Sequence, residues 1–299
     1  MAVNLNEAAL LQFERHLVQI SLSPKTIASY LADLRVFTRW GTQANRDHFS
    51  IVQVSPDHIR AYLAYLLEDL GRTPATANRH LQALRKWCAF ITKTNLVSCN
   101  AAEEISLVPL EAGEEPQGLS ATACTALLEA AEDTRVAIAK RDVAILTLLL
   151  RTGLRVSEVV NLNVDDVVFD YPGVHLKIQD GRGRGAREIP ITPDVCRKMK
   201  EYLLVRSKAS QSQQLFLTQE GSGLSARTVQ RIVYRCTRQA NLRGVTAQLL
   251  RRTYAMNLLH ETQDLDLVRE RLGHQTTNIT LRYLNLQDEK EVGDNYHGK

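Results

Sequence analysis

The 299-residue sequence lacks the features of several classes of protein. Its five cysteines are odd in number and form no Cys-x-x-Cys pair, which argues against a disulfide framework and a zinc knuckle. We expect them to be reduced and mostly buried. No apolar run approaches the roughly 18 to 20 residues that a membrane span needs. The first residues also lack the basic start and apolar block of a secretory signal. The sequence therefore predicts a soluble, cytoplasmic protein with no membrane contact.

Length and charge indicate two domains with different surfaces. At 299 residues and 44% apolar content, the chain is longer than most single domains and can bury a large core. Residues 1–117 carry 11 basic and 12 acidic residues. From totals of 37 and 33, residues 118–299 keep 26 basic and 21 acidic residues. The positive excess, which favours acidic partners such as nucleic acid, therefore lies in the second part.

The first hundred residues predict a four-helix domain. Ser23-Pro24, Ser55-Pro56 and Thr73-Pro74 each place a capping hydroxyl before a proline at the first helical position. Helices should therefore begin near residues 24, 56 and 74. Apolar residues at helical spacing predict an earlier helix over about 7–20.

Three basic residues of the helix that begins at 74 recur every seven positions: Arg79, Lys86 and Lys93. A heptad step drifts by only about 20° around a helix, so the three share one face. That face is either an ordinary solvated surface or a stripe that contacts nucleic-acid phosphates.

The domain boundary is predicted in an acidic, proline-containing stretch. Residues 106–117 include three glutamates and two prolines, a composition typical of a linker. We therefore assign a helical domain to 1–105, a second domain to 118–285 and a C-terminal tail to 286–299.

The second domain reads as mainly helical with a small β-hairpin or sheet. Helices are expected at 120–131 and around 143–150, with a break at Gly153 and a new helix near Val156. Two β-like runs, 175–179 and 187–191, flank the glycine- and arginine-rich segment 181–185. This pattern predicts a hairpin with a strongly basic tip.

A further helix, capped by Ser225, carries a basic face. Arg227, Arg231 and Arg238 share one broad side of it. Arginines so placed can bind phosphates or guanine edges in a DNA groove. The alternative is a solvated charged face.

Four short motifs occur in an order that identifies a family resemblance. Residues 152–158 read Thr-Gly-Leu-Arg-Val-Ser-Glu, and 248–255 read Gln-Leu-Leu-Arg-Arg-Thr-Tyr-Ala. Leu272-Gly273-His274 and then Tyr283 follow. The second segment is similar to a His-x-Leu-Arg-His-x-x-Ala pattern. With these motifs the chain resembles the tyrosine recombinases or phage-type integrases, especially their Xer-like branch.

The resemblance implies a fold, an activity and an assembly. The fold would be a helical, SAM-like core-binding domain followed by a mixed, mostly helical catalytic domain. The activity would be site-specific DNA recombination through a 3′-phosphotyrosyl intermediate, of the kind associated with DNA integration and mobile elements. The partners would be double-stranded DNA and further copies of the chain, four protomers on two paired sites.

The candidate catalytic residues suit this chemistry. The Tyr283 phenolate can form a phosphotyrosine bond while an alcohol leaves. Arg155 and Arg251 offer forks of donors to the charged phosphate, and His274 can donate to a non-bridging oxygen. We expect no metal and no cofactor, because the bond energy is retained in the covalent intermediate.

Two departures from the family pattern matter for the chemistry. Aligning on residues 187–190 puts Arg182 where the family has a general-acid lysine, and arginine is a poor proton donor. Arg184 and Lys177 are possible substitutes. Gln248 stands where a histidine is expected, and an amide cannot exchange a proton at neutral pH.

These departures leave two other functions open. One is a type IB topoisomerase-like enzyme, with the same chemistry but relaxation of DNA by a monomer. The other is a DNA-binding or architectural protein on a catalytically weakened integrase scaffold.

Overall fold

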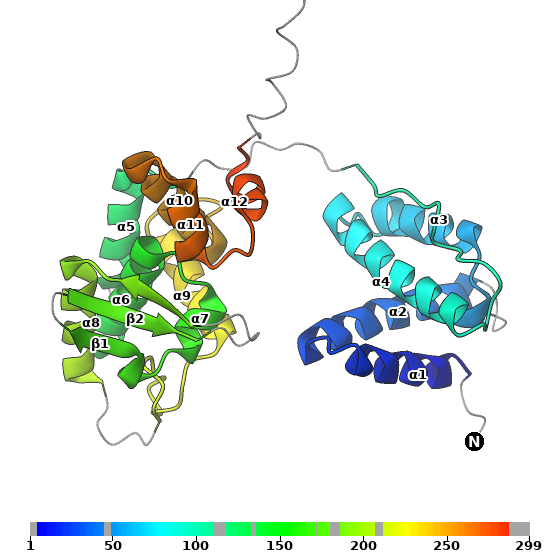
Figure 1. Ribbon diagram of the computed structural model, residues 1–299, viewed down its shortest axis with the longest axis horizontal. Coiled ribbons are helices and arrows are strands. Elements are labelled where there is room, and N and C mark those ends of the chain that lie inside the picture. The colour runs from blue at the N-terminus through cyan, green and yellow to red at the C-terminus, as the bar shows by residue number, and fades with distance from the viewer. Residues whose placement is uncertain are drawn as a thin grey trace, which may run out of the picture. The chain divides into compact units, whose positions relative to one another are not determined.

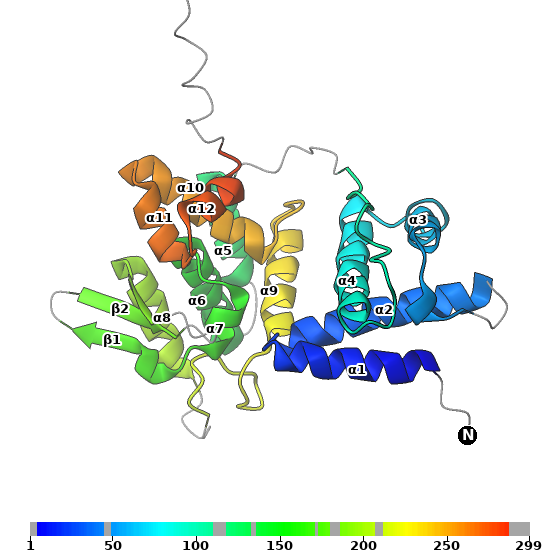
Figure 2. The same cartoon turned by 45° about the vertical axis from the view of Figure 1, so that its right-hand side comes forward.

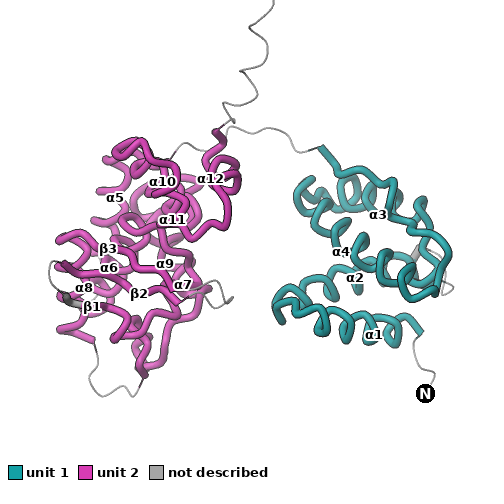
Figure 3. The backbone as a smooth tube through the Cα atoms, in the orientation of Figure 1, with its two compact units in different colours: residues 1–114 teal, residues 115–299 magenta. Residues whose placement is uncertain are grey.

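The computed structural model describes residues 5–44, 49–109, 118–132, 136–170, 173–179, 186–206 and 212–286. The chain divides into two compact units, residues 1–114 and 115–299 (Figure 3). Across the described ranges, no helix is long and apolar enough to cross a membrane.

The first unit is a helical bundle whose helices begin where the sequence predicts. Its helices are α1 (Leu5–Gln19), α2 (Pro24–Ala44), α3 (Pro56–Ala64) and α4 (Pro74–Lys93), with the short helical turns η1 (Ile51–Gln53) and η2 (Tyr65–Asp69). The Ser55 and Thr73 side chains accept hydrogen bonds from the backbone N–H groups of His58 and Thr76. The predicted hydroxyl-proline starts at 24, 56 and 74 are therefore confirmed.

Aromatic side chains fill the core of this unit. Phe13, Phe37, Tyr62 and Trp87 are almost fully buried, and Phe13 meets Trp87 edge to face at a centroid distance of 5.4 Å. The Trp87 indole N–H donates to the Ile51 carbonyl at 2.8 Å. Helix α4 thus buries one face, and the opposite face carries the exposed Lys86 and Lys93.

The second unit is built around the apolar helix α6 (Figures 1 and 2). Its elements are α5 (Ala121–Glu132), α6 (Val136–Thr152), α7 (Val156–Asn161), η3 (Val164–Asp166), β1 (Val167–Asp170), β2 (Gly173–Ile178), β3 (Arg187–Pro190), α8 (Pro193–Val205), α9 (Ala226–Gln239), α10 (Ala247–Thr262), α11 (Leu265–Leu272) and α12 (Thr277–Leu284). Helix α6 contacts α5, α8 and α10. Most of its residues from Val143 to Leu150 are buried in the main core.

The sheet has one more strand than the sequence predicts. Strands β1, β2 and β3 pair antiparallel in that order, with Val167 opposite Leu176 and Ile178 opposite Arg187. Strand β1 follows a helical turn and has only four residues, so its apolar pattern is too short to distinguish it from a loop.

A satellite core holds the last three helices together. Ala255, Val268, Leu272 and Leu284 form its buried centre, and Tyr283 packs against it. Helix α11 ends at Gly273, whose φ is +63°, a left-handed conformation that glycine adopts without strain. The chain therefore turns sharply at Gly273, directly before His274.

The cysteines are free, but fewer are buried than expected. Cys88 and Cys236 are buried, Cys124 and Cys196 are partly buried, and Cys99 is exposed. Burial raises the pKa of the Cys88 thiol to about 12, so this thiol stays protonated at neutral pH.

Candidate active site

Arg155 lies at the N-terminus of α7, where Glu158 holds it. The backbone N–H of Arg155 donates to Glu158 Oε2 at 2.7 Å, and its Nη1 donates to Oε1 at 3.1 Å. The same side chain reaches the Gly273 carbonyl through Nη2 at 3.5 Å. It remains 41% exposed, so part of its guanidinium is available to a ligand.

Arg251 is buried on α10 and is fixed by backbone carbonyls. The residue is 2% exposed, and its Nη1 and Nη2 donate to the carbonyls of Gly153 and Leu272, each at 2.6 Å. Burial, with the neighbouring charge of Arg155, lowers the pKa of Arg251 to about 10. The guanidinium therefore still carries its charge at neutral pH.

His274 lies between Arg251 and α12 as a neutral ring. Its Nε2 is 3.3 Å from Arg251 Nη2, and because a guanidinium can only donate, this nitrogen must be the acceptor. The other nitrogen, Nδ1, lies 3.0 Å from the Thr280 hydroxyl and so carries the ring proton. Burial, followed by the charges of Arg251 and Arg155, lowers the pKa of His274 to about 4, in agreement with this assignment.

Tyr283 completes the group from α12. Its ring meets the His274 ring edge to face at a centroid distance of 5.4 Å. Its hydroxyl donates to the backbone carbonyl of Gln248 at 3.2 Å. Burial raises the pKa of Tyr283, while the charges of Arg251 and Arg252 oppose that rise.

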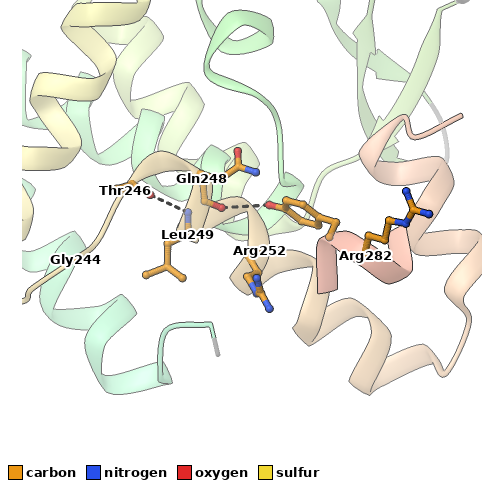
Figure 4. A pocket seen from close by; sticks show the side chains of 7 residues that line it. Gly244, Thr246, Gln248, Leu249, Arg252 and Arg282 are labelled. Atoms are coloured by element: carbon orange, nitrogen blue, oxygen red, sulfur yellow. Dashed lines mark hydrogen bonds between the residues drawn. The ribbon is translucent and has the colours of Figure 1, made fainter. Parts of the chain in front are cut away.

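The tyrosine borders a pocket of about 390 Å³ at the N-terminus of α10. Figure 4 shows Gln248 and Arg252 on α10, with Arg282 of α12 across from them. The Gln248 residue is exposed, and its main-chain carbonyl makes the hydrogen bond with the tyrosine hydroxyl. Arg252 is 8% exposed and donates to the Leu284 carbonyl at 3.4 Å, which fixes the end of α12.

The structure adds Glu158, Arg187 and Thr280 to the candidate site. Glu158 faces the guanidiniums of Arg155, Arg187 and Arg251 at 3.1, 3.0 and 3.8 Å. Burial opposes the ionisation of Glu158, but these guanidiniums and the Arg155 N–H outweigh it and lower its pKa. The sequence offered a signal for Glu158, three residues after Arg155 at a helix start, and none for Arg187 or Thr280.

The other candidates for the chemical step are Arg182, Arg184 and Lys177. Arg182 and Arg184 fall in 180–185, outside the described residues. Lys177 is exposed on β2 and borders a second cavity of about 240 Å³, which Glu158 also lines. Lys177 and Glu158 therefore share one cavity.

The predicted DNA-contacting residues differ in their exposure and in their ion pairs. Arg227, Arg231 and Arg238 are exposed on α9, opposite its buried face. In the first unit, Arg79 forms an ion pair with Asp33, a carboxylate that is 4% exposed. Half of the Arg79 side chain remains accessible, so a phosphate would share this guanidinium with Asp33.

The site combines a phenol with concentrated positive charge. Three guanidiniums surround a single carboxylate, so the group carries an excess of positive charge that an anion would neutralise. Forked donors around a nucleophilic oxygen are suited to a phosphate ester whose charge grows during attack. Fold and site together define an enzyme of phosphoryl transfer that acts through a tyrosine.

Comparison with known families agrees with this class. The model of the phage integrase family matches residues 118–290, and that of the phage integrase N-terminal SAM-like domain matches residues 10–95. The chain belongs to the phage integrase family of tyrosine recombinases. The resemblance noted in the sequence and the two-domain fold class are therefore confirmed.

Individual relatives cover nearly the whole chain. The tyrosine recombinase XerC of Neisseria gonorrhoeae (strain ATCC 700825 / FA 1090) is 31% identical over 274 residues, 91% of this chain and 88% of its own. The tyrosine recombinase XerD of Oceanobacillus iheyensis (strain DSM 14371 / CIP 107618 / JCM 11309 / KCTC 3954 / HTE831) is 29% identical over 94% of both chains.

Solved structures share the fold. The XerH site-specific recombinase in its post-cleavage complex superposes with a TM-score of 0.73 at 24% identity, over 89% of this chain and 78% of that one. A lambda integrase dimer fragment, residues 75–356, gives a TM-score of 0.70 at 19% identity, over 91% and 96%. At these identities the likeness concerns the fold alone.

Proposed function

We propose that this protein is a site-specific DNA recombinase that cleaves and rejoins duplex DNA through Tyr283. The observation that carries the proposal is the contact between the tyrosine and the charged cluster. Tyr283 lies against His274, and His274 is hydrogen-bonded to Arg251. The XerH and lambda integrase structures that share the fold are complexes with DNA, which supports duplex DNA as the substrate.

The reaction breaks one bond for each bond it forms. The Tyr283 oxygen attacks the scissile phosphorus, the bond from phosphorus to the 5′ oxygen breaks, and a 3′-phosphotyrosyl bond remains. The phenol loses its proton and the leaving oxygen gains one. Attack by the 5′-hydroxyl of a partner strand reverses these steps and completes the exchange.

The guanidiniums of Arg155 and Arg251 stabilise the charge that accumulates on the phosphate. A preorganised donor of this kind contributes about 10²-fold to 10³-fold to the rate. Burial and then the neighbouring guanidiniums lower the pKa of His274. The phosphate charge offsets the guanidiniums, so the ring gains a proton more readily on DNA. A protonated His274 can donate to a non-bridging oxygen.

DNA contacts extend beyond the reacting phosphate. The exposed arginines Arg227, Arg231 and Arg238 on α9 are suited to phosphates or base edges. Lys86 and Lys93 on α4 offer a second basic face, together with Arg79, which is ion-paired with Asp33. Arg182 or Arg184 would act on the leaving oxygen. Exchange between two sites requires four active tyrosines, and we propose a tetramer.

The test is covalent capture on a nicked suicide substrate. Wild-type protein should form an adduct that survives denaturation, and Tyr283→Phe should form none while it shifts a half-site with unchanged affinity. The matched control is Tyr65→Phe, since Tyr65 packs against Trp40 and Tyr62 in the first unit, outside the cluster. An adduct on Tyr283→Phe protein would refute the assignment.

The same assay separates the other functions. An adduct with relaxation of supercoils but no strand exchange would indicate a topoisomerase-like enzyme. Specific binding without any adduct would indicate an architectural protein. Strand exchange between two sites, with four protomers in the complex, is the outcome we expect.

A further inference from the structure

Arg187, the first residue of β3, makes two polar contacts around the active site. Its Nη1 forms an ion pair with Glu158 Oε1 at 3.0 Å, and its Nε donates to the Arg271 carbonyl at 3.2 Å. The side chain is only 15% exposed. Its Nη2 is buried without a hydrogen-bond partner, a costly arrangement that a purely structural arginine would avoid.

Arg187 and Arg271 form a reciprocal connection between β3 and the end of α11. Arg271 Nη1 donates to the Glu188 carbonyl at 3.1 Å, while Arg187 donates to the Arg271 carbonyl. The two residues after Arg271 lead to Gly273, and a Cβ there would lie 3.0 Å from Arg187 Nη1. The guanidinium of Arg187 therefore packs directly on the Gly273 backbone.

Gly273 and Glu158 are also the partners of the predicted phosphate-binding arginines. Arg155 donates to the Gly273 carbonyl and to Glu158 Oε1, the oxygen that Arg187 also contacts. Arg251 lies 3.8 Å from Glu158 Oε2. Arg187 thus competes with both arginines for one carboxylate and limits how strongly Glu158 binds them.

We propose that Arg187 is a positioning residue for the recombination reaction. By sharing Glu158 and packing on Gly273, it keeps the guanidiniums of Arg155 and Arg251 directed to the phosphate instead of to the carboxylate. The inference rests on the proposed function, because it concerns the same site. It assigns Arg187 no contact with the reacting atoms.

The experiment measures single-turnover adduct formation on the nicked suicide substrate. Arg187→Met removes the charge and every donor, and the cleavage rate should fall by about 10²-fold, the effect of a misplacement of about 1 Å. Arg187→Lys retains the ion pair with Glu158 and should recover part of this loss. Half-site affinity should change little for both variants.

The control separates positioning from folding. Arg206→Met removes a half-buried arginine of the same unit that donates to the carbonyls of Ser212, Gln214 and Leu215. Even where Arg206→Met lowers the free energy of unfolding, the cleavage rate of the folded protein should stay unchanged. An equal loss of rate in the Arg206 and Arg187 variants at matched stability would overturn the proposal.

Two further readouts locate the effect. In an Arg251→Lys background the rate loss from Arg187→Met should shrink to less than about 10-fold, because both changes disturb one phosphate-binding unit. If the rate losses of the two variants are fully additive, Arg187 acts elsewhere.

A substrate with sulfur at the leaving position should not rescue the cleavage rate of Arg187→Met. Rescue would place the role of Arg187 at the leaving oxygen. A wild-type protein that forms no adduct would instead refute the proposed function.

Discussion

Gly153 offers a quantitative test of how the site is supported. Its φ is +61°, and a Cβ at this position would lie 2.3 Å from Tyr254 Cδ1. Gly153→Ala should therefore combine two costs, about 1–2 kcal/mol for a left-handed residue with a side chain and about 1–3 kcal/mol for overpacking. We expect the second unit to lose about 2–5 kcal/mol of its free energy of unfolding.

The assay is denaturant unfolding followed by two probes. Both tryptophans, Trp40 and Trp87, belong to the first unit, so their fluorescence reports that unit alone. Far-ultraviolet circular dichroism reports both units. Gly153→Ala should shift the circular dichroism transition of the second unit and leave the fluorescence transition in place.

Gly244→Ala is the matched control, because Gly244 has a φ of +70° and open space around its Cβ position. It should cost only about 1–2 kcal/mol. If Gly153→Ala and Gly244→Ala lower the free energy of unfolding equally, the Tyr254 ring moves aside without an energetic penalty. The overpacking argument would then be wrong. Since the Gly153 carbonyl holds Arg251, Gly153→Ala should also slow cleavage, by about 10²-fold.

Three other predictions follow from charges in the structure. The folded-state pKa of His274 is about 4, below the usual value of about 6.5. The stability from its neutral ring is therefore complete above pH ~6.5 and is lost as the pH falls toward 4. Because His274 is partly exposed, we expect this loss to be about 1–2 kcal/mol of the free energy of unfolding. His274→Asn should abolish this part of the pH dependence of unfolding. Arg227→Ala and Arg231→Ala should each reduce the slope of log affinity against log salt by about 1, whereas Arg197→Ala, on an exposed ion-paired residue of α8, should not. Asp142 is fully buried between Arg141 and Arg235, so Asp142→Ala should cost the second unit about 3–5 kcal/mol in the same unfolding assay.

The fold was predictable where local chemistry determines it. The capped starts of α2, α3 and α4 depend on residues within one helical turn, so the sequence alone locates them. Strand β1 depends on its pairing with β2, a contact that no local pattern records. Most of the predicted linker, 106–117, lies outside the described residues, so the domain boundary stays a prediction.

The site was predictable as a set of residue types and not as an arrangement. The order of Arg155, Arg251, His274 and Tyr283 identified the family, and the structure brings these four together. How they are held depends on Glu158 and Arg187, which meet across segments distant in the chain. In the same way, the basic stripe on α4 could not reveal that Arg79 is paired with the buried Asp33, 46 residues away.

The structure shows that glutamine in place of histidine at position 248 affects the site less than the sequence suggests. The Tyr283 hydroxyl donates to the main-chain carbonyl of this residue, and that contact does not depend on the side chain. Replacement of a histidine by glutamine therefore leaves the Tyr283 hydroxyl docked on α10, although it removes a group that could exchange protons.

The family pattern has a second histidine at the position of Arg252, so α10 replaces two imidazoles with an amide and a buried guanidinium. Burial raises the pKa of Tyr283, and the charges of Arg251 and Arg252 oppose that rise. Arg252 also fixes the end of α12 through the Leu284 carbonyl. A guanidinium cannot accept the phenolic proton, but it stabilises the phenolate once the proton has left. The fixed charge of Arg252 thus opposes part of the rise in the Tyr283 pKa that burial causes.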